Sequence, residues 1–477
     1  MTYEFCGRKV STPLGLNGGQ KAALEAVAEF ATGDGECMTL MGFAGTGKTT
    51  LMGIVRDMLQ FEMPLQFSAT THKAAGVLKS RVGGSVSTVN SLFGIIVEQD
   101  LDADRYDVSV KRRREGDDRL VRGSLVVIDE ASMLSEENFR DVMGRCREHG
   151  CKVLFVGDPA QLAPVGEDDV SVVFRQDAGR TAVLTEVERT DDGGILAEAT
   201  AVRNGAELSM EDSGGVTFIG CGEGERVAAV LDRNIPGLRD DPNWFRVLSF
   251  TNRNVGAVNT AVRRRLGFGD GGPREGEPMM SYANWGYDWR RRRTGTPYRF
   301  VNSESYQVVG VGEPYVADVG GYVEPERWSG GELPLTAVPL TLKDALGQTV
   351  TVPYMDVKGN PDNMRAARLL AHQKQLLWSR WRTAPLKAKQ GYLARINEID
   401  EMLFTNDSIR DADGSLLQAK VIDYGYAHTI HKSQGSTFTN VLVNDTDICI
   451  CPDSRTRRQL RYVAITRASG HVDIIVR

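Results

Sequence analysis

Short apolar runs recur along the chain, and stretches with helical periodicity lie between them. The runs predict strands at 38–41, 65–69, 125–128 and 152–156 in the first half of the chain, and at 245–250, 441–444 and 472–476 in the second. Helical patterns accompany them, for example at 51–59 and 457–464. Apolar strands that alternate with helices are typical of open α/β layers with buried sheets. The pattern therefore predicts two α/β layers.

The second layer is interrupted by a region of different character. This region begins Gly- and Arg-rich at 267–293, continues as short alternating strands at 306–311 and 349–352, and ends in a helical stretch at 363–404. Short strands separated by turn signals favour a small β-barrel. The domains are therefore predicted as a first layer (1–93 and 123–187), a small insertion (94–122), a second layer (188–265 and 419–477) and a large insertion (266–418).

Composition places the chain among ordinary globular proteins, with 41% hydrophobic and 25% charged residues in 477. No apolar run approaches the roughly eighteen residues that a membrane span requires. Residues 1–8 lack the apolar segment of a secretory signal, and the seven cysteines are scattered without the spacing of metal ligands. We therefore expect reduced thiols, a cytoplasmic location and no membrane partner.

The net charge of −6 argues against a uniformly basic nucleic-acid binder, but the positive charge is concentrated. Basic runs stand at 111–114, 263–265 and 290–293, and the last follows four aromatic residues between 282 and 289. Arginines interleaved with aromatics suit contact with a phosphate backbone and stacking on bases. The alternative for each run is a solvated loop without a partner.

Residues 42–49 read GFAGTGKT, the phosphate-loop pattern, between a predicted strand and a predicted helix. Glycines at these positions let backbone N–H groups surround phosphates at the positive end of a helix. Lys48 is expected to reach the β- and γ-phosphates and the Thr49 hydroxyl to hold Mg²⁺. A chance Gly-rich turn is the alternative. The residues expected to contact ATP here are Gly42, Ala44, Gly45, Thr46, Gly47, Lys48, Thr49 and Thr50.

Two later strands end in residues suited to hydrolysis. The run 125–128 leads into Asp129, placed to hold Mg²⁺, and Glu130, placed to orient and deprotonate an attacking water. The run 152–156 leads into a Gly-Asp-Pro turn followed by Gln161, at the sheet edge where α/β proteins bind ligands. Its amide suits contact with a γ-phosphate and the water. The alternatives are a solvent-exposed acidic pair and an ordinary surface turn.

These three segments, in this order, resemble motifs I, II and III of superfamily-1 helicases. Further segments resemble the remaining motifs: 16–20 (the Q motif), 69–75 (Ia), 87–92 (Ib), 184–189 (IV), 428–437 (V) and 461–468 (VI). The pattern is most similar to the RecD/Dda-like branch, whose members include phage enzymes and translocate 5′→3′. The resemblance covers nearly the whole chain.

The resemblance implies roles for further residues. Gln20 would read adenine, Arg189 would point at the γ-phosphate, and Arg467 would be an arginine finger supplied by the second layer. Gly435 of motif V is assigned to the nucleotide in the same way. The catalytic set would then be Lys48, Asp129, Glu130, Gln161, Arg189 and Arg467. The DNA track would be formed by Thr70, Thr71, His72, Lys73, Thr88, Asn90, Thr429, His431 and Lys432.

The fold that the resemblance implies is α/β: two tandem RecA-like P-loop domains with inserted subdomains. The large insertion would be an SH3-like β-barrel with a helical tower, and the small one a pin that splits the duplex. Two features depart from the family pattern. Asn90 stands where the family commonly has His, and the small insertion lacks an obvious aromatic tip, for which Tyr106, Arg112 and Arg113 are the candidates.

The predicted function is therefore an ATP-dependent 5′→3′ DNA helicase, in which ATP hydrolysis opens and closes the cleft between the layers. Its expected partners are single-stranded and forked DNA and a single-strand-binding protein or replisome component, and it is expected to act as a monomer. The alternatives are a translocase that strips proteins without separating strands, and a nucleotide-gated recombination accessory protein. A small-molecule kinase would leave motifs V and VI unexplained.

Overall fold

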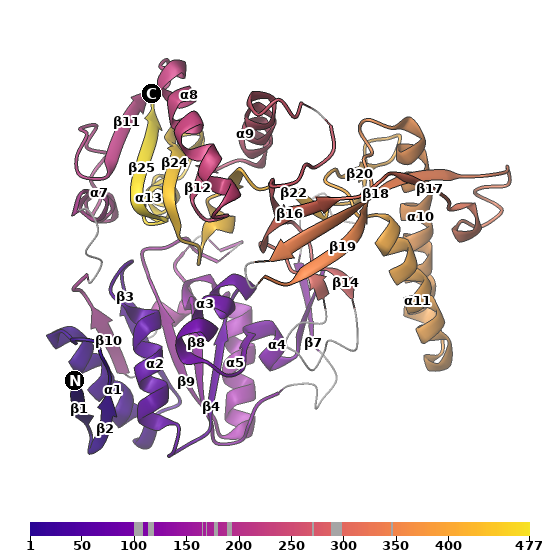
Figure 1. Ribbon diagram of the computed structural model, residues 1–477. Coiled ribbons are helices and arrows are strands. Elements are labelled where there is room, and N and C mark those ends of the chain that lie inside the picture. Colours follow the sequence, from indigo (N-terminus) through magenta and orange to yellow (C-terminus); the bar gives the residue numbers. More distant parts are fainter. Residues whose placement is uncertain are drawn as a thin grey trace.

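The structure is a computed structural model, in which two α/β domains lie one above the other and a third, inserted domain lies beside them (Figure 1). It describes residues 1–99, 108–112, 119–164, 166–167, 169–175, 180–187, 193–269, 271–287, 298–344 and 347–477. None of the helices in these ranges has the length and apolarity that a membrane crossing requires.

The first domain is built on a parallel sheet in the order β10-β3-β9-β8-β4-β5. Its strands are β3 (Cys37–Gly42), β4 (Leu65–Ala69), β5 (Val86–Thr88), β8 (Leu125–Asp129), β9 (Lys152–Gly157) and β10 (Arg180–Leu184). Its helices are α1 (Gly18–Thr32), α2 (Lys48–Leu59), α3 (His72–Val82), α4 (Val89–Phe93), α5 (Glu136–His149) and α6 (Val172–Arg175). A hairpin of β1 (Thr2–Phe5) and β2 (Arg8–Ser11) precedes them.

The second domain is built on another parallel sheet, in the order β11-β25-β24-β12-β23. Its strands are β11 (Val216–Gly220), β12 (Phe245–Ser249), β23 (Ala427–Thr429), β24 (Phe438–Asn444) and β25 (Ala468–Val476). Its helices are α7 (Gly193–Arg203), α8 (Gly224–Asn234), α9 (Asn252–Arg265), α12 (Asp445–Ile448) and α13 (Ser454–Ile465). All seven strands expected in the two layers are present, with ends that differ by a few residues. The α/β prediction is confirmed.

The inserted domain joins an antiparallel sheet, β17-β18-β16-β13-β22 with β19 on β18, to two long helices. The sheet contains β13 (Pro278–Ser281), β16 (Ser305–Val311), β17 (Tyr315–Asp318), β18 (Pro334–Asp344), β19 (Thr349–Tyr354) and β22 (Ile422–Tyr424). The hairpins β14 (Trp285–Tyr287) with β15 (Tyr298–Phe300) and β20 (Ile409–Arg410) with β21 (Leu416–Gln418) accompany it. The single expected helical stretch is two helices, α10 (Pro361–Thr383) and α11 (Leu386–Met402).

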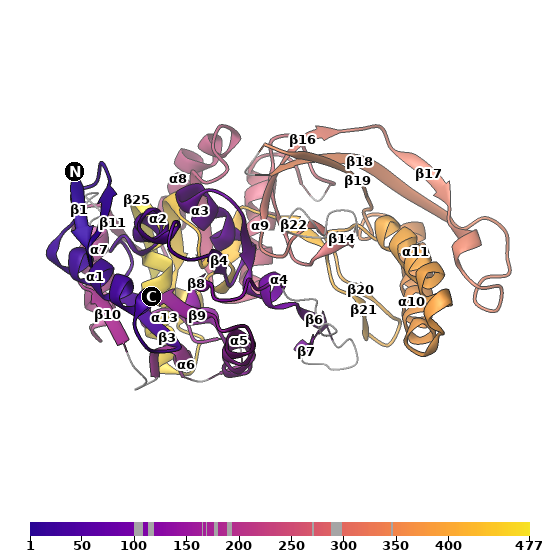
Figure 2. The ribbon, with the colours of Figure 1, turned by 90° about the horizontal axis from the view of Figure 1, so that it is seen from below.

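A small hairpin occupies part of the predicted pin. Strand β6 (Ile95–Gln99) pairs with β7 (Val108–Arg112) in antiparallel register directly after α4. Figure 2 shows this hairpin on the side of the first domain that faces the inserted domain. The tip candidates Tyr106 and Arg113 lie outside the described residues, and so does the side chain of Arg112. The pin role stays a prediction.

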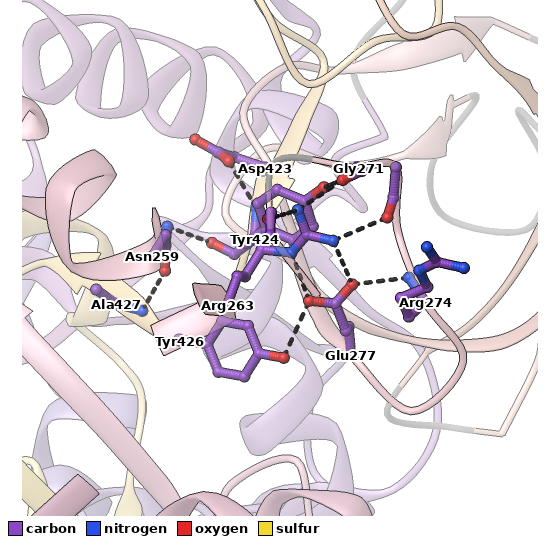
Figure 3. A network of polar contacts seen from close by, with 11 residues as sticks. Asn259, Arg263, Gly271, Arg274, Glu277, Asp423, Tyr424, Tyr426 and Ala427 are labelled. Carbon is purple, nitrogen blue, oxygen red and sulfur yellow. Dashed lines mark hydrogen bonds and ion pairs between the residues drawn. The ribbon is translucent and has the colours of Figure 1, made fainter. Parts of the chain in front are cut away.

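A buried ion pair fixes the inserted domain on the second domain (Figure 3). Arg263, at the end of α9, donates to both carboxylate oxygens of Glu277, at 2.8 and 3.2 Å, and both side chains are almost fully buried. The guanidinium lies 4.0 Å from the ring of Tyr424 in β22, and the hydroxyl of Tyr426 donates to Glu277. Because breaking a buried pair is costly, this contact holds the two domains in one arrangement.

Candidate active site and nucleic-acid interface

The loop between β3 and α2 has the backbone geometry of a phosphate loop. Gly45 and Gly47 have φ of 81° and 82°, in the left-handed region that glycine adopts without strain. A Cβ on Gly42 would lie 2.6 Å from Oγ1 of Thr46, so a larger residue does not fit there. The Thr46 hydroxyl is itself bonded to the carbonyl of Phe43 at 2.9 Å. The glycines of the motif therefore stand where the loop requires them.

The two functional side chains at the start of α2 both find partners. The ammonium of Lys48 donates to the carbonyls of Gly42, at 2.7 Å, and Phe43, at 3.0 Å. The hydroxyl of Thr49 donates to Oδ2 of Asp129, at 3.1 Å, at the end of β8. The predicted phosphate-binding cation and the predicted metal ligands are thus brought to the same edge of the sheet.

Glu130 is held in a strained backbone conformation beside Asp129. Its φ of 54° is left-handed, which costs energy for a residue with a side chain and is typical of functional sites. Its N–H donates to Oδ1 of Asp129 at 2.9 Å, and its carbonyl accepts from the Thr70 hydroxyl at 3.1 Å. Burial, and then the charge of Glu130, raise the pKa of Asp129 to about 6. Asp129 is buried, whereas Glu130 is partly exposed.

Gln161 lies on the neighbouring strand end, because β9 pairs with both β3 and β8. The Asp158 side chain shapes the turn by accepting from the N–H of Ala160 at 2.9 Å, and the Asp158 carbonyl accepts from the N–H of Gln161 at 3.2 Å. Oε1 of Gln161 and Oε2 of Glu130 are buried without a hydrogen-bond partner among the described residues. Buried polar atoms normally have partners, so these two are suited to a ligand.

Gln20 reaches the phosphate loop from the first turn of α1. Its side chain forms a capping box with Asn17, and its Nε2 donates to the carbonyl of Thr46 at 3.3 Å. Thr50 is in α2, one residue beyond Thr49. The contact with Thr46 places Gln20 against the loop backbone, while its role as an adenine reader stays a prediction.

Of the two predicted arginines, Arg467 lies among the described residues. Arg467 is buried, and its guanidinium donates to the carbonyls of Val463, at 3.1 Å, and Ser436, at 3.0 Å, both in its own domain. Arg189 lies outside the described residues. Their roles at the γ-phosphate stay predictions. An arginine that the sequence did not single out does reach the loop: the guanidinium of Arg203, in α7, lies 3.5 Å from the ring centroid of Phe43.

The predicted DNA motifs Ia and V meet between the two domains. Thr71 caps α3 by accepting from the N–H of Ala74. Gly435 has φ of 70°, and a Cβ there would lie 3.5 Å from that of Ala74. The ammonium of Lys73 lies 5.1 Å from the ring of Phe438. Gly435 therefore packs against Ala74 of the predicted motif Ia, and its assignment to the nucleotide stays a prediction.

Cations gather around Phe438. Arg246, fully buried in β12, lies 5.0 Å from the ring and donates to the carbonyls of Phe245 and Pro242. Burial, and then the charges of Arg246 and Arg467, lower the pKa of Lys73 to about 7. Burial lowers the pKa of Arg246 to about 10. Burying positive charges away from water is costly unless an anion is bound beside them. This cluster is therefore suited to binding a phosphate group.

Motif V also contacts the inserted domain. The ammonium of Lys432 donates to Oδ1 of Asn302 at 2.9 Å and lies 4.0 Å from the ring of Tyr282. Burial, and then the charge of Lys420, lower the pKa of Lys432 to about 8. Burial lowers the pKa of His72 to about 4, and lowers that of His431 too. Both imidazoles are therefore neutral near pH 7 and offer hydrogen bonds rather than charge.

The hydroxyls assigned to the DNA track already have local roles. Thr88 caps α4 by accepting from the N–H of Ser91, at 3.2 Å, and Asn90 lies in that short helix. Thr429 accepts from the N–H of Lys432 at 3.3 Å. Both threonine side chains are buried, so these bonds fix the loops that carry the motifs.

Comparisons with known proteins agree with this arrangement. The family model described as an AAA domain matches residues 15–220, and that of the UvrD-like helicase C-terminal domain matches residues 424–475. The chain is 28% identical over 259 residues to the "ATP-dependent DNA helicase dda" of Enterobacteria phage T4, a match that covers 53% of this chain and 57% of that protein. It is 22% identical to an uncharacterized protein of Acanthamoeba polyphaga mimivirus, covering 92% of this chain and 94% of that one.

Among solved structures, Bacteroides Pif1 bound to single-stranded DNA resembles this one with a TM-score of 0.50. The two are 16% identical, and the likeness covers 96% of this chain and 92% of that one. It supports the tandem RecA-like fold and leaves the SH3-like barrel a prediction. With the two family models in the expected order, the resemblance to superfamily-1 helicases is confirmed. The match to the phage helicase spans just over half of that protein's length.

Proposed function

We propose that this chain is an ATP-dependent DNA helicase that moves 5′→3′ along single-stranded DNA and separates the duplex ahead of it. The observation that carries the proposal is the convergence of the strand ends of β3, β8 and β9 at one edge of the first sheet, beneath helix α13 of the second domain. A ligand bound at that edge contacts both domains, so its hydrolysis can change how they pack.

The residues at this edge fit a nucleoside triphosphate with Mg²⁺. The loop offers N–H groups at the start of α2 and the Lys48 ammonium, and Thr49 and Asp129 offer the oxygen ligands that Mg²⁺ prefers. Buried oxygens of Glu130 and Gln161, which have no hydrogen-bond partner in the described part of the chain, lie at the adjacent strand ends. When bound, Mg²⁺ would neutralise charge on the β- and γ-phosphates.

In the hydrolysis step, the Glu130 carboxylate accepts a proton from water while the water oxygen attacks the γ-phosphorus and the bond to ADP breaks. Gln161 orients the water through its buried amide oxygen. Arg189 and Arg467 would stabilise the charge of the transition state. For Arg467 this requires its guanidinium to leave the carbonyls of Val463 and Ser436.

The nucleic-acid side of the proposal rests on the cations between the domains. Lys73 lies on the first domain and Arg246 on the second, both beside Phe438, and Lys432 links motif V to the inserted domain. A change in domain packing would therefore move one phosphate-contacting group relative to the others. The proposed partners are single-stranded and forked DNA, with a single-strand-binding protein or replisome component, and the proposed state is a monomer.

A paired unwinding assay tests the function. One duplex carries a 5′ single-stranded tail and the other a 3′ tail, with ATP and Mg²⁺ present and Lys48→Ala as the inactive control. Opening of the 5′-tailed duplex alone supports the proposal, and opening of the 3′-tailed duplex alone overturns the direction. If neither opens while single-stranded DNA stimulates ATP hydrolysis, the chain is a translocase. Unwinding by Lys48→Ala would contradict the whole account.

A further inference from the structure

Tyr462, on helix α13 of the second domain, forms two hydrogen bonds to the first domain. Its hydroxyl accepts from the N–H of Ala44, in the phosphate loop, at 2.9 Å, and donates to Oδ2 of Asp158 at 2.7 Å. Tyr462 is 2% exposed and Asp158 is fully buried. One hydroxyl therefore joins the phosphate loop, the turn after β9 and a helix of the other domain.

A second contact holds the same part of the loop. The Arg203 guanidinium stacks on the ring of Phe43, the residue before Ala44. The side chain of Ala44 packs against the apolar core of the second domain, next to Ile195 and Ala199. In this structure, the first residues of the phosphate loop are therefore docked on α7 and α13 by a hydrogen bond, a cation–π contact and apolar packing.

The N–H of Ala44 belongs to the loop whose N–H groups bind phosphate oxygens, and one N–H serves one good acceptor at a time. We propose that Tyr462 is a positioning residue that competes with the phosphates of the nucleotide for this N–H, forming a phosphate-loop latch (the Tyr462–Ala44 bond) that nucleotide binding breaks. The inference rests on the proposed nucleotide site and adds to it a residue through which the second domain senses occupancy.

The surroundings of Tyr462 favour transmission of this change to the whole second domain. The neighbouring Arg461 donates to both carboxylate oxygens of Asp445, at 2.7 and 2.9 Å, and pairs with Glu207 at 2.6 Å. This buried ion pair fixes α13 on its own domain. Loss of the latch therefore loosens the phosphate loop from the second domain as a whole, because α13 is held in that domain and cannot tilt alone. Arg467, five residues after Tyr462, belongs to the second domain and moves with that domain.

Tyr462→Phe tests the latch, because it removes the hydroxyl and keeps the ring. Since a hydrogen bond contributes modestly to the net free energy, we expect a fluorescent ADP analogue to bind this variant about two- to tenfold more tightly than it binds the wild type, without DNA. General damage to the site would instead weaken binding. Tyr426→Phe is the matched control, because it loses a buried hydroxyl bond to Glu277 away from the loop and should bind as the wild type does.

Unchanged or weaker binding by Tyr462→Phe overturns the latch. If that variant does not fold, Arg203→Ala takes its place: loss of the cation–π contact should tighten binding by about two- to fivefold, and unchanged binding overturns the proposal. The measurement needs neither hydrolysis nor unwinding. If the wild type binds ADP but opens no duplex, the helicase proposal alone is contradicted. If Tyr462→Phe binds ADP as tightly as the wild type does, the latch alone is contradicted.

Discussion

The hydroxyl of Thr49 donates to Oδ2 of Asp129 across 3.1 Å, and this bond joins the phosphate loop to the end of β8. Both oxygens are ligands of the kind that Mg²⁺ binds, and they come from segments 80 residues apart. Burial, and then the charge of Glu130, raise the pKa of Asp129 to about 6, so its ionised carboxylate would be stabilised by a further positive charge. A divalent cation would supply one.

The first prediction concerns this pair and pH. A raised carboxyl pKa means that Asp129 takes up a proton as the pH falls through about 6, and a protonated carboxyl is a poor metal ligand. ATP hydrolysis measured at sub-saturating Mg²⁺ should therefore fall as the pH is lowered through this range. Additional Mg²⁺ should restore it. A decline that Mg²⁺ does not reverse would show that another group is responsible.

Glu130→Gln should separate binding from turnover. The amide keeps the size of the side chain but cannot accept the proton from water, so kcat for ATP should fall by about 10²- to 10⁴-fold. Nucleotide affinity, measured with the fluorescent ADP, should stay near that of the wild type because the phosphate loop is untouched. Glu137→Gln, at an exposed position of α5, is the control and should keep full activity. Equal activity of the two variants would remove Glu130 from the mechanism.

Much of this architecture could be predicted from the sequence because buried parallel strands have no polar face. All five residues of β8 are buried, so the run 125–128 stands out as uniformly apolar. The three residues of β23 are also buried, but a segment that short is not distinguishable from a turn. The prediction of a single helical stretch at 363–404 missed the break between α10 and α11. Pro385 lies at this break, and its ring cannot continue a helix.

Some residues of the candidate site could likewise be predicted from the sequence, and others could not. Lys48, Thr49 and Asp129 were predictable, because each belongs to a local pattern at the end of one strand. Tyr462 and Arg203 were not, because their partners are in the other domain. Ala44 is 418 residues from Tyr462 in the chain, and no local spacing encodes that contact. Residues that couple two domains are set by tertiary packing, so the structure is needed to find them.

Lys73→Met should stabilise the fold while weakening DNA binding. The pKa of Lys73 is about 7 in the fold against 10.5 when unperturbed, so between those values the unfolded chain binds a proton that the folded chain does not. The resulting penalty is complete below pH 7 and disappears as the pH rises toward 10.5. Because the side chain keeps some exposure, we expect Met to add about 1 kcal/mol at pH 7.

The measurement is thermal unfolding of the two chains at pH 7 and pH 9.5, with titration of single-stranded DNA at pH 7. Lys79→Met, at an exposed position on the same helix, should change neither quantity appreciably. A gain in stability that is equal at both pH values would contradict the assigned cause, because desolvation of the charged form acts only where Lys73 would otherwise be protonated.

The last prediction separates a buried ion pair from an exposed one on the same helix. Arg263→Met leaves the carboxylate of Glu277 buried beside Tyr426 without its partner, which should cost about 3–5 kcal/mol. Arg265→Met breaks the ion pair between Arg265 and Asp232, in which both side chains are largely exposed. This loss should cost less than about 1 kcal/mol of stability. Thermal unfolding compares the two variants directly. Limited proteolysis should also cut Arg263→Met faster at the junction with the inserted domain, because this pair fastens that domain to α9. Equal unfolding temperatures would mean that apolar packing alone holds the junction.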